Sequence, residues 1–332
     1  MFNKKALVTG GAGFIGSHLV DLLVKQGIKV VIIDNLSTGK LSNLGKYQES
    51  NMVKILIADI SDQSTFDALD DSFDYVFHIA ALADIVPSIS NPAPYYSSNL
   101  IGTLNLLEYL RRKSDVKLVF AASSSCYGIP TTFPTPENAK IDHKYPYAHS
   151  KYLAESTVMH YASVFGLKAI SLRLFNVYGK RARSNGNYGA VMGVFLAQRL
   201  AGEPLTVVGD GSQLRDFVHV EDVARAFLMA AESDLSNQIF NIGSGKPNSI
   251  GYLATLIGGE IEYIPWRPGE PSITHANIEK VTSQLNWNPE IKFEEGINDL
   301  LLHIEDWKDA PIWDRHSIKE ATANWFKYLP ND

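Results

Sequence analysis

The sequence predicts an α/β protein in which a doubly wound parallel sheet is followed by a smaller C-terminal α/β lobe. Short runs of β-branched residues alternate with helical patterns through the first half of the chain, as in other parallel sheets flanked by helices. A glycine-rich turn follows the first of these runs, and 45% of the 332 residues are hydrophobic, enough for a large core. The expected strands are residues 5–9, 30–34, 55–58, 75–79, 117–121 and 168–173.

A complete strand-helix-strand unit opens the chain. Ile15, Leu19 and Leu23 recur at helical spacing after the first strand, and Gly27 ends that helix before the second strand. The pattern becomes less regular after about residue 178, without a linker or repeat that would separate two independent domains. We therefore expect a first domain over residues 1–176, to which short segments near 214–242 return, and a second lobe over residues 177–332.

An extra helix is expected at the end of the second lobe. Ser317-Ile318-Lys319-Glu320 has the Ser-x-x-Glu form of a capping box, so the helix is predicted to begin at Ser317. Its apolar residues fall on one helical face, which is more typical of packing than of ligand binding. These residues are Ile318, Ala321, Trp325, Phe326 and Leu329.

Composition and charge exclude several classes of partner. The 36 acidic residues outnumber the 30 basic ones, for a formal net charge of -6, so nucleic acid is not expected as a partner. No apolar run reaches the roughly 18 residues of a membrane span. The first residues run directly into a strand and Cys126 is the only cysteine, so we expect a cytoplasmic protein without an intramolecular disulfide. His78, His219 and His275 lack metal-ligand spacing, and no metal is expected.

A glycine-rich turn lies between the first strand and the first helix. Gly10, Gly11, Gly13 and Gly16 would let a pyrophosphate approach the helix N-terminus, where free N–H groups and the helix dipole favour negative charge. The motif can be parsed from Gly10 or from Gly11, and alone it can also be a plain structural turn. Asp34 ends the second strand, where its carboxylate can accept hydrogen bonds from both adenosine ribose hydroxyls and would repel a 2′-phosphate. A Rossmann-type domain that binds NAD rather than NADP is therefore predicted.

Tyr147 and Lys151 lie four residues apart at the start of a long helical pattern, and so on one face of that helix. A phenol with a pKa of about 10 is a poor base near neutrality, so a neighbouring ammonium is needed to favour the phenolate. An isolated Tyr-x-x-x-Lys pattern is by default a surface pair. Ser123, at the end of the preceding strand, favours a catalytic function because its hydroxyl can hydrogen-bond a reacting oxygen.

Together these motifs resemble the extended short-chain dehydrogenase/reductase family, and within it the NAD-dependent nucleotide-sugar epimerases and dehydratases. The resemblance covers essentially the whole chain. It is more specific for the family than for the substrate. It is carried by residues 9–16, 78–81, 99–103, 123–128, 147–151, 173–179, 209–217 and 267–270.

The resemblance implies roles for individual residues. Tyr147 would take the proton from the sugar 4-hydroxyl while C4 delivers hydride to the nicotinamide. Lys151 would hold the nicotinamide ribose and lower the pKa of the phenol. Ser123 matches the active-site serine or threonine of the family. The residues expected to contact NAD are Gly10, Gly13, Phe14, Ile15, Gly16, Asp34, Asn35, Ser37, Thr38, Gly39, Asp59, Ile60, Ala80, Ala81, Ala83, Asn99, Tyr147, Lys151 and Phe175. Those expected to contact the nucleotide-sugar are Ser88, Ser124, Ser125, Asn176, Val191, Thr206, Val208, Arg215, Arg267, Glu270 and Thr274.

Ser124 and Ser125 discriminate among the reactions of the family. In the 4,6-dehydratases an Asp-Glu pair follows the active-site threonine, and the related decarboxylases usually keep a glutamate at the place of Ser125. A C4 epimerase, which oxidises the sugar, turns the 4-keto intermediate and returns the hydride, fits these serines best. The open alternatives are a 4,6-dehydratase, a net 4-dehydrogenase and a catalytically silent NAD-binding sensor or scaffold.

The resemblance also suggests a substrate and an assembly. A UDP-sugar is favoured, and Thr274 matches a place where a small residue admits N-acetylated or otherwise larger sugars. Helices near residues 99–112 and 147–165 are expected to pair across a two-fold axis in a homodimer. Cys126 is expected to be a packed, unreactive thiol, and His149 a neighbour of Tyr147 rather than an acid.

Overall fold

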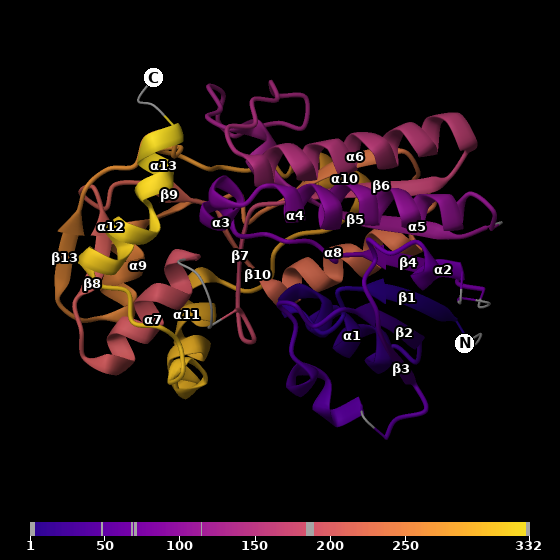
Figure 1. The fold of residues 1–332 in the computed structure, drawn as a ribbon, viewed down its shortest axis with the longest axis horizontal. Helices are drawn as coiled ribbons and strands as arrows, with labels where there is room; N and C mark the ends of the chain where they lie inside the picture. The colour runs from indigo at the N-terminus through magenta and orange to yellow at the C-terminus, as the bar shows by residue number, and fades with distance from the viewer. Residues whose placement is uncertain are drawn as a thin grey trace.

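A seven-stranded parallel sheet forms the centre of the first domain (Figure 1). The computed structural model describes residues 4–47, 49–67, 69, 72–113, 115–183 and 189–329. The strands, in the order β11-β6-β5-β4-β1-β2-β3, all pair in parallel. Their bounds are β1 Lys5–Thr9, β2 Lys29–Asp34, β3 Val53–Ile57, β4 Tyr75–His78, β5 Lys117–Ser123, β6 Lys168–Leu174 and β11 Gln238–Ile242. The predicted Rossmann-type fold is confirmed, and each of the six predicted strands is present.

Helices cover both faces of this sheet, as the alternation of apolar side chains requires. On one face Val8 of β1 packs in a core with α1 (Phe14–Lys25) and α8 (Val220–Glu232). On the other face Leu7 packs in a core with α5 (Gly102–Leu110) and α6 (Pro146–Phe165). The sheet therefore holds α6 against the carboxyl end of β5.

The second lobe has a core of its own. The parallel pair β8 (Leu205–Val208) and β13 (Ile261–Ile264) packs with α7 (Val191–Ala201), α9 (Ile250–Ile257) and α11 (Phe293–Leu302). Two further strand pairs are present: β7 (Asn176–Tyr178) with β10 (Phe217–His219), and β9 (Leu214–Arg215) with β12 (Asn248–Ser249). After β10 the chain returns to the first domain as α8 and β11.

Shorter helices complete the described chain. They are α2 Ser64–Asp67, α3 Ile85–Ser90, α4 Ala93–Tyr96, α10 Glu279–Leu285, a π-helix over Ser97–Ile101 and 3-10 helices over Leu41–Tyr47, Ser124–Tyr127 and Ile304–Trp307. Within the described residues, no helix is long and apolar enough to cross a membrane.

The C-terminal segment differs from the prediction. Two helices, α12 (Arg315–Ala321) and α13 (Ala323–Tyr328), replace the single helix, and Asp314 rather than Ser317 is the N-cap. The Asp314 carboxylate accepts a hydrogen bond from Ser317 N at 2.7 Å, and Asp314 N donates to Ser317 Oγ at 3.0 Å. The prediction was wrong because the serine serves at the third helical position of the box. Phe326, expected on the packing face, is 46% exposed.

Candidate active site

The glycine-rich turn brings backbone close to backbone at the end of β1. Gly10 has φ +74°, and a Cβ there would lie 2.7 Å from Ala80 N. A Cβ on Gly16 would lie 2.1 Å from Gly10 O, so neither position accepts a side chain without a shift of the backbone. Helix α1 starts after Gly13 without a side-chain cap, which leaves the N–H groups of its first turn without the usual partner. This arrangement suits a dinucleotide pyrophosphate.

Asp34 is fixed beside this turn at the end of β2. Its Oδ2 accepts a hydrogen bond from Ala12 N at 2.9 Å, and its Oδ1 accepts one from Leu36 N at 2.8 Å. A Cβ on Gly39 would lie 2.9 Å from Oδ1, so the following loop also approaches the carboxylate. Burial raises the pKa of Asp34, although these backbone donors oppose the shift. Each oxygen keeps a second lone pair that a ribose hydroxyl can use.

The other predicted cofactor residues gather in loops at the same edge of the sheet, where the carboxyl ends of parallel strands meet. Asn35 Nδ2 donates to Asp59 Oδ2 at 2.8 Å, which joins the loops after β2 and β3. Ile60 is buried beneath Gly102 of α5. The remaining members are Phe14 and Ile15 at the start of α1, Ser37 and Thr38 after β2, Ala80, Ala81 and Ala83 after β4, and Phe175 after β6.

Asn99, in the π-helix, connects the loop after β4 to the catalytic helix. Its Oδ1 accepts a hydrogen bond from Leu82 N at 2.8 Å. Its Nδ2 donates to Leu82 O and to Ser150 Oγ, each at 3.0 Å. Only 1% of Asn99 is exposed, so its buried amide fixes the loop after β4 relative to helix α6.

The phenol of Tyr147 meets the predicted serine. It lies near the side chains of Ser123 and Ser125, whose hydroxyl oxygens are 2.8 Å apart. Burial raises the pKa of Tyr147, whereas the serine hydrogen bonds lower it. Tyr147 N donates to Ser88 Oγ at 3.2 Å, and Ser88 is fully buried. The structure therefore places Ser88 under the first turn of α6, as a support for the tyrosine.

Lys151 follows one turn later on the same helix and is 4% exposed. Burial lowers the pKa of its ammonium to about 7, and the nearby Glu155 carboxylate opposes that shift. Its Nζ lies 4.4 Å from the ring centroid of Phe120, and it makes no hydrogen bond or ion pair with another described residue. The amine thus lacks acceptors that the hydroxyls of a bound ribose would supply.

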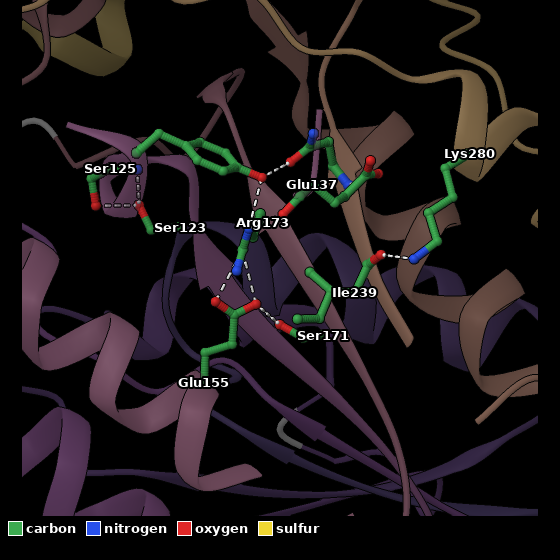
Figure 2. A network of polar contacts seen from close by, with 10 residues as sticks. Ser123, Ser125, Glu137, Glu155, Ser171, Arg173, Ile239 and Lys280 are labelled. Atoms are coloured by element: carbon green, nitrogen blue, oxygen red, sulfur yellow. Dashed lines mark hydrogen bonds and ion pairs between the residues drawn. The ribbon is translucent and has the colours of Figure 1, made fainter. Parts of the chain in front are cut away.

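A buried polar network is centred on Glu155, one turn after Lys151 on α6, and on Arg173 (Figure 2). Arg173 Nε lies 3.0 Å from both carboxylate oxygens of Glu155, and Ser171 Oγ donates to Glu155 Oε1 at 2.8 Å. Arg173 Nη1 donates to Tyr127 OH at 2.8 Å and to Glu137 O at 2.9 Å. The network fastens α6 to β6 and to the segment after β5. The sequence did not indicate it, because a glutamate within an amphipathic helix is usually exposed.

Charged residues of the second lobe gather at one place. Glu270 Oε1 accepts a hydrogen bond from Arg215 Nη2 at 2.8 Å, and Glu270 Oε2 lies 3.7 Å from Arg267 Nη1. Glu270 Oε2 is buried without a hydrogen-bond partner among the described residues. Two guanidinium groups suit a diphosphate, and the open carboxylate oxygen suits a hydroxyl donor.

The other residues predicted to contact the substrate lie on several separate elements. Thr274 Oγ1 donates to Asn176 Oδ1 at 2.9 Å, so these two are brought together. Thr206 Oγ1 accepts a hydrogen bond from Gln198 Nε2 at 2.8 Å inside the second lobe. Val208 is also buried in that lobe, and Val191 is the first residue of α7. Ser124 begins the 3-10 helix after β5.

A cavity of about 470 Å³ opens between the cofactor loops and the C-terminal segment. Ser37, Thr38 and Leu82 line one part of it, and Trp313 and Ala321 line another. The sequence does not indicate that the C-terminal segment lines this cavity, because a local pattern cannot predict a contact between residues so far apart in the chain.

Cys126 and His149 lie close to the site, and neither was expected to take part in catalysis. Burial raises the pKa of the Cys126 thiol to about 12, which leaves almost no thiolate near neutrality. His149 Nδ1 lies 2.9 Å from Tyr96 OH, and its ring centroid lies 4.5 Å from that of His143. Among the described residues no group of three or more His, Cys, Asp or Glu side chains could hold a metal ion.

Known proteins are similar to this chain in sequence and fold. The model of the NAD dependent epimerase/dehydratase family matches residues 6–243. The UDP-glucose 4-epimerase of Mycolicibacterium smegmatis is 34% identical over 301 residues, covering 88% of this chain and 96% of that protein. The structure of the Thermotoga maritima UDP-glucose 4-epimerase with UDP-glucose has a TM-score of 0.84 at 35% identity. The match covers 92% of this chain and 99% of that chain. The structure of the Methanobrevibacter ruminantium UDP-N-acetylglucosamine 4-epimerase in complex with UDP-N-acetylmuramic acid has a TM-score of 0.85 at 35% identity. The match covers 92% of this chain and 98% of that chain.

Proposed function

This chain belongs to the NAD-dependent epimerase/dehydratase family, and we propose that it inverts C4 of a UDP-sugar through a transient 4-keto intermediate. The observation that carries the proposal is the Tyr147 phenol, which lies near the Ser123 and Ser125 hydroxyls and one helical turn from the buried amine of Lys151. A base, a hydroxyl and a cation thus converge at the carboxyl edge of the sheet.

The first domain holds the cofactor. The first turn of α1 receives the pyrophosphate, Asp34 accepts from the adenosine ribose, and Lys151 donates to the nicotinamide ribose. Bound NAD would supply the hydride acceptor for oxidation at C4 and the hydride donor for the reduction that follows. The division into an NAD-binding domain over residues 1–176 and a substrate lobe over 177–332 belongs to the same proposal.

Tyr147 handles the proton. Its phenolate removes the proton of the sugar 4-hydroxyl, and the phenol returns that proton when the 4-keto sugar has turned and is reduced on the opposite face. Ser123 donates a hydrogen bond to the reacting oxygen. A protonated Lys151 favours the phenolate by its charge, in opposition to the effect of burial.

Epimerisation accounts for the polar groups better than elimination of water does. The residues after Ser123 are the hydroxyl-bearing Ser124 and Ser125, which cannot act as the acid and base on C5 and C6 that elimination requires. Asp84, a carboxylate whose charge raises the Tyr147 pKa, is ion-paired with Arg183. Oxidation and reduction at C4 need no acid or base besides the tyrosine, with NAD as the hydride carrier.

The substrate's nucleotide lies against the second lobe. Arg215 and Arg267 pair with the diphosphate, and Glu270 Oε2 accepts from a nucleoside ribose hydroxyl. Thr274, which donates a hydrogen bond to Asn176, is a small residue at this place, and that favours N-acetylated or otherwise larger hexoses.

Assembly and location complete the proposal. Helices α5 and α6 lie side by side on the sheet, and Val164 and Phe165 at the end of α6 are 57% and 52% exposed. A homodimer through these helices, in the cytoplasm, is expected. Light scattering of the purified protein tests the assembly: a monomer at micromolar concentration contradicts it.

The reaction is tested with a panel of UDP-, GDP- and dTDP-sugars without added NAD. NMR of the products should show a C4 epimer of a UDP-sugar. A stable 4-keto-6-deoxy sugar would instead identify a dehydratase. Stoichiometric release of NADH would identify a net dehydrogenase, and absence of turnover with NAD bound would favour a silent binding protein.

A further inference from the structure

We propose that Trp325 is a positioning residue for the nucleotide-binding segment 267–270, so that helix α13 forms part of the substrate pocket. This inference rests on the proposed function and deepens it. The family model ends at residue 243, so Trp325 and the 267–270 segment lie outside the matched part of the chain.

The indole of Trp325 joins two parts of the site. Its Nε1 donates a 2.6 Å hydrogen bond to Pro268 O, between Arg267 and Glu270. Its ring centroid lies 5.9 Å from that of Tyr145, which is the N-cap of the catalytic helix α6. Only 4% of Trp325 is exposed. One side chain therefore connects the arginine-bearing segment to the start of the helix that carries Tyr147.

Other residues of the C-terminal segment reinforce this connection. A Cβ on Gly269 would lie 3.8 Å from the Leu329 side chain, which is ordinary van der Waals contact. Asn324 Nδ2 donates to Ser90 Oγ at 3.0 Å, at the end of α3. Figure 1 shows α13 in yellow beside α3, and the two helices are in contact. The segment thus touches α3, α6 and the 267–270 segment together.

The 267–270 segment needs such a support. It belongs to no helix or strand, Pro268 has no N–H to donate, and Gly269 has φ +69°. Its side chains nevertheless have to meet a diphosphate with the precision of a hydrogen bond. The Pro268 carbonyl supplies a fixed point because a tight indole N–H holds it. Loss of that bond lets Arg267 and Glu270 move relative to Arg215.

Trp325→Phe separates this role from simple packing, since it keeps an aromatic ring against Tyr145 and removes the N–H donor. We expect the Kd for UDP, measured by calorimetry on the NAD-bound protein, to rise about three- to tenfold, the effect of one lost hydrogen bond. The KM for the sugar should rise in parallel. Bound NAD and kcat should stay within about twofold, because Tyr147 and Lys151 are unaltered.

Phe326→Ala is the matched control, since Phe326 is the next residue and its side chain is exposed. It should leave the UDP affinity unchanged. Leu329→Ala, which shortens the side chain that faces Gly269 but keeps the hydrogen bond, should weaken UDP less than Trp325→Phe does. Equal UDP affinity of Trp325→Phe and the unaltered protein would overturn the positioning role while leaving the epimerase proposal intact. Failure of the unaltered protein to bind UDP would overturn both.

Discussion

Arg173 and Glu155 form a buried ion pair in which Nε of the guanidinium lies 3.0 Å from both oxygens of the carboxylate. Their side chains are 5% and 2% exposed. Glu155 stands one turn beyond Lys151 on α6, and Arg173 is on β6, so the pair fixes the catalytic helix against the sheet (Figure 2). The same carboxylate favours the charged form of Lys151. Glu155 is therefore expected to affect both the stability of the domain and the charge of Lys151.

Glu155→Gln is expected to destabilise the protein by about 3–5 kcal/mol, because it leaves a buried guanidinium without its counter-charge. Urea unfolding followed by circular dichroism measures the change. Glu108→Gln removes a more exposed carboxylate, paired with Arg111 at 2.7 Å, and should cost less than about 1 kcal/mol. Equal effects of the two substitutions would show that the buried pair does not anchor the helix.

Asp34→Asn is expected to weaken NAD about 10- to 100-fold, since it removes the charge from two ribose hydrogen bonds. NADP should be affected less, because the repulsion of the 2′-phosphate is also removed. Titration of protein stripped of dinucleotide measures both affinities. Asp62→Asn, at an exposed carboxylate after β3, is the control. Unaltered NAD affinity in Asp34→Asn would contradict the assigned contact.

The pH dependence of stability should reveal the buried amine of Lys151. Burial lowers its pKa to about 7 in the native protein, against 10.5 for an ordinary lysine. Between these values the unfolded chain binds the proton and the native protein does not. The free energy of unfolding should therefore rise with pH over this window, by up to about 1.4 kcal/mol per pH unit from this group.

Urea unfolding of dinucleotide-free protein at pH 7 and pH 9 tests this expectation. The unaltered protein should gain stability relative to Lys151→Met as the pH rises. Parallel pH profiles of the two proteins would show that the amine titrates normally in the native state, and so is not desolvated.

Tyr147→Phe should lower kcat by about 10²- to 10⁴-fold, because it removes the group that exchanges the proton. Bound NAD should be retained, which the absorbance of the purified protein reports. Tyr152→Phe, on the same helix but with its ring against His143, should be close to the unaltered enzyme. Full activity of Tyr147→Phe would remove the basis of the mechanism.

The strands of the sheet were predictable because each depends on a local pattern of residues. Each β-branched run forms a strand as expected, and the glycine turn and Asp34 meet because successive parallel strands end at one edge. β11 was indicated only within the short returns expected near 214–242, since it joins β6 after the chain has left for the second lobe. No local signal states which edge of a sheet such a segment will extend.

The parts of the site that were not predictable depend on contacts between distant residues. Trp325 reads as a packing residue in the sequence, and nothing near it names Pro268, 57 residues away, as the acceptor of its N–H. Glu155 reads as a solvent-facing residue until Arg173 is known to lie opposite. The cap at Asp314 was missed because Ser317 matches a motif in which it takes a different position.

The central claim is that C4 of the sugar gives up a hydride and recovers the same one within a single active site. The most direct measurement is turnover of UDP-glucose or UDP-N-acetylglucosamine carrying deuterium at C4, in ordinary water and without added NAD. The account predicts a C4 epimer that retains the deuterium at C4, as read by NMR and mass spectrometry. Loss of the label to solvent, or a product that remains oxidised while the label stays on released cofactor, would contradict it.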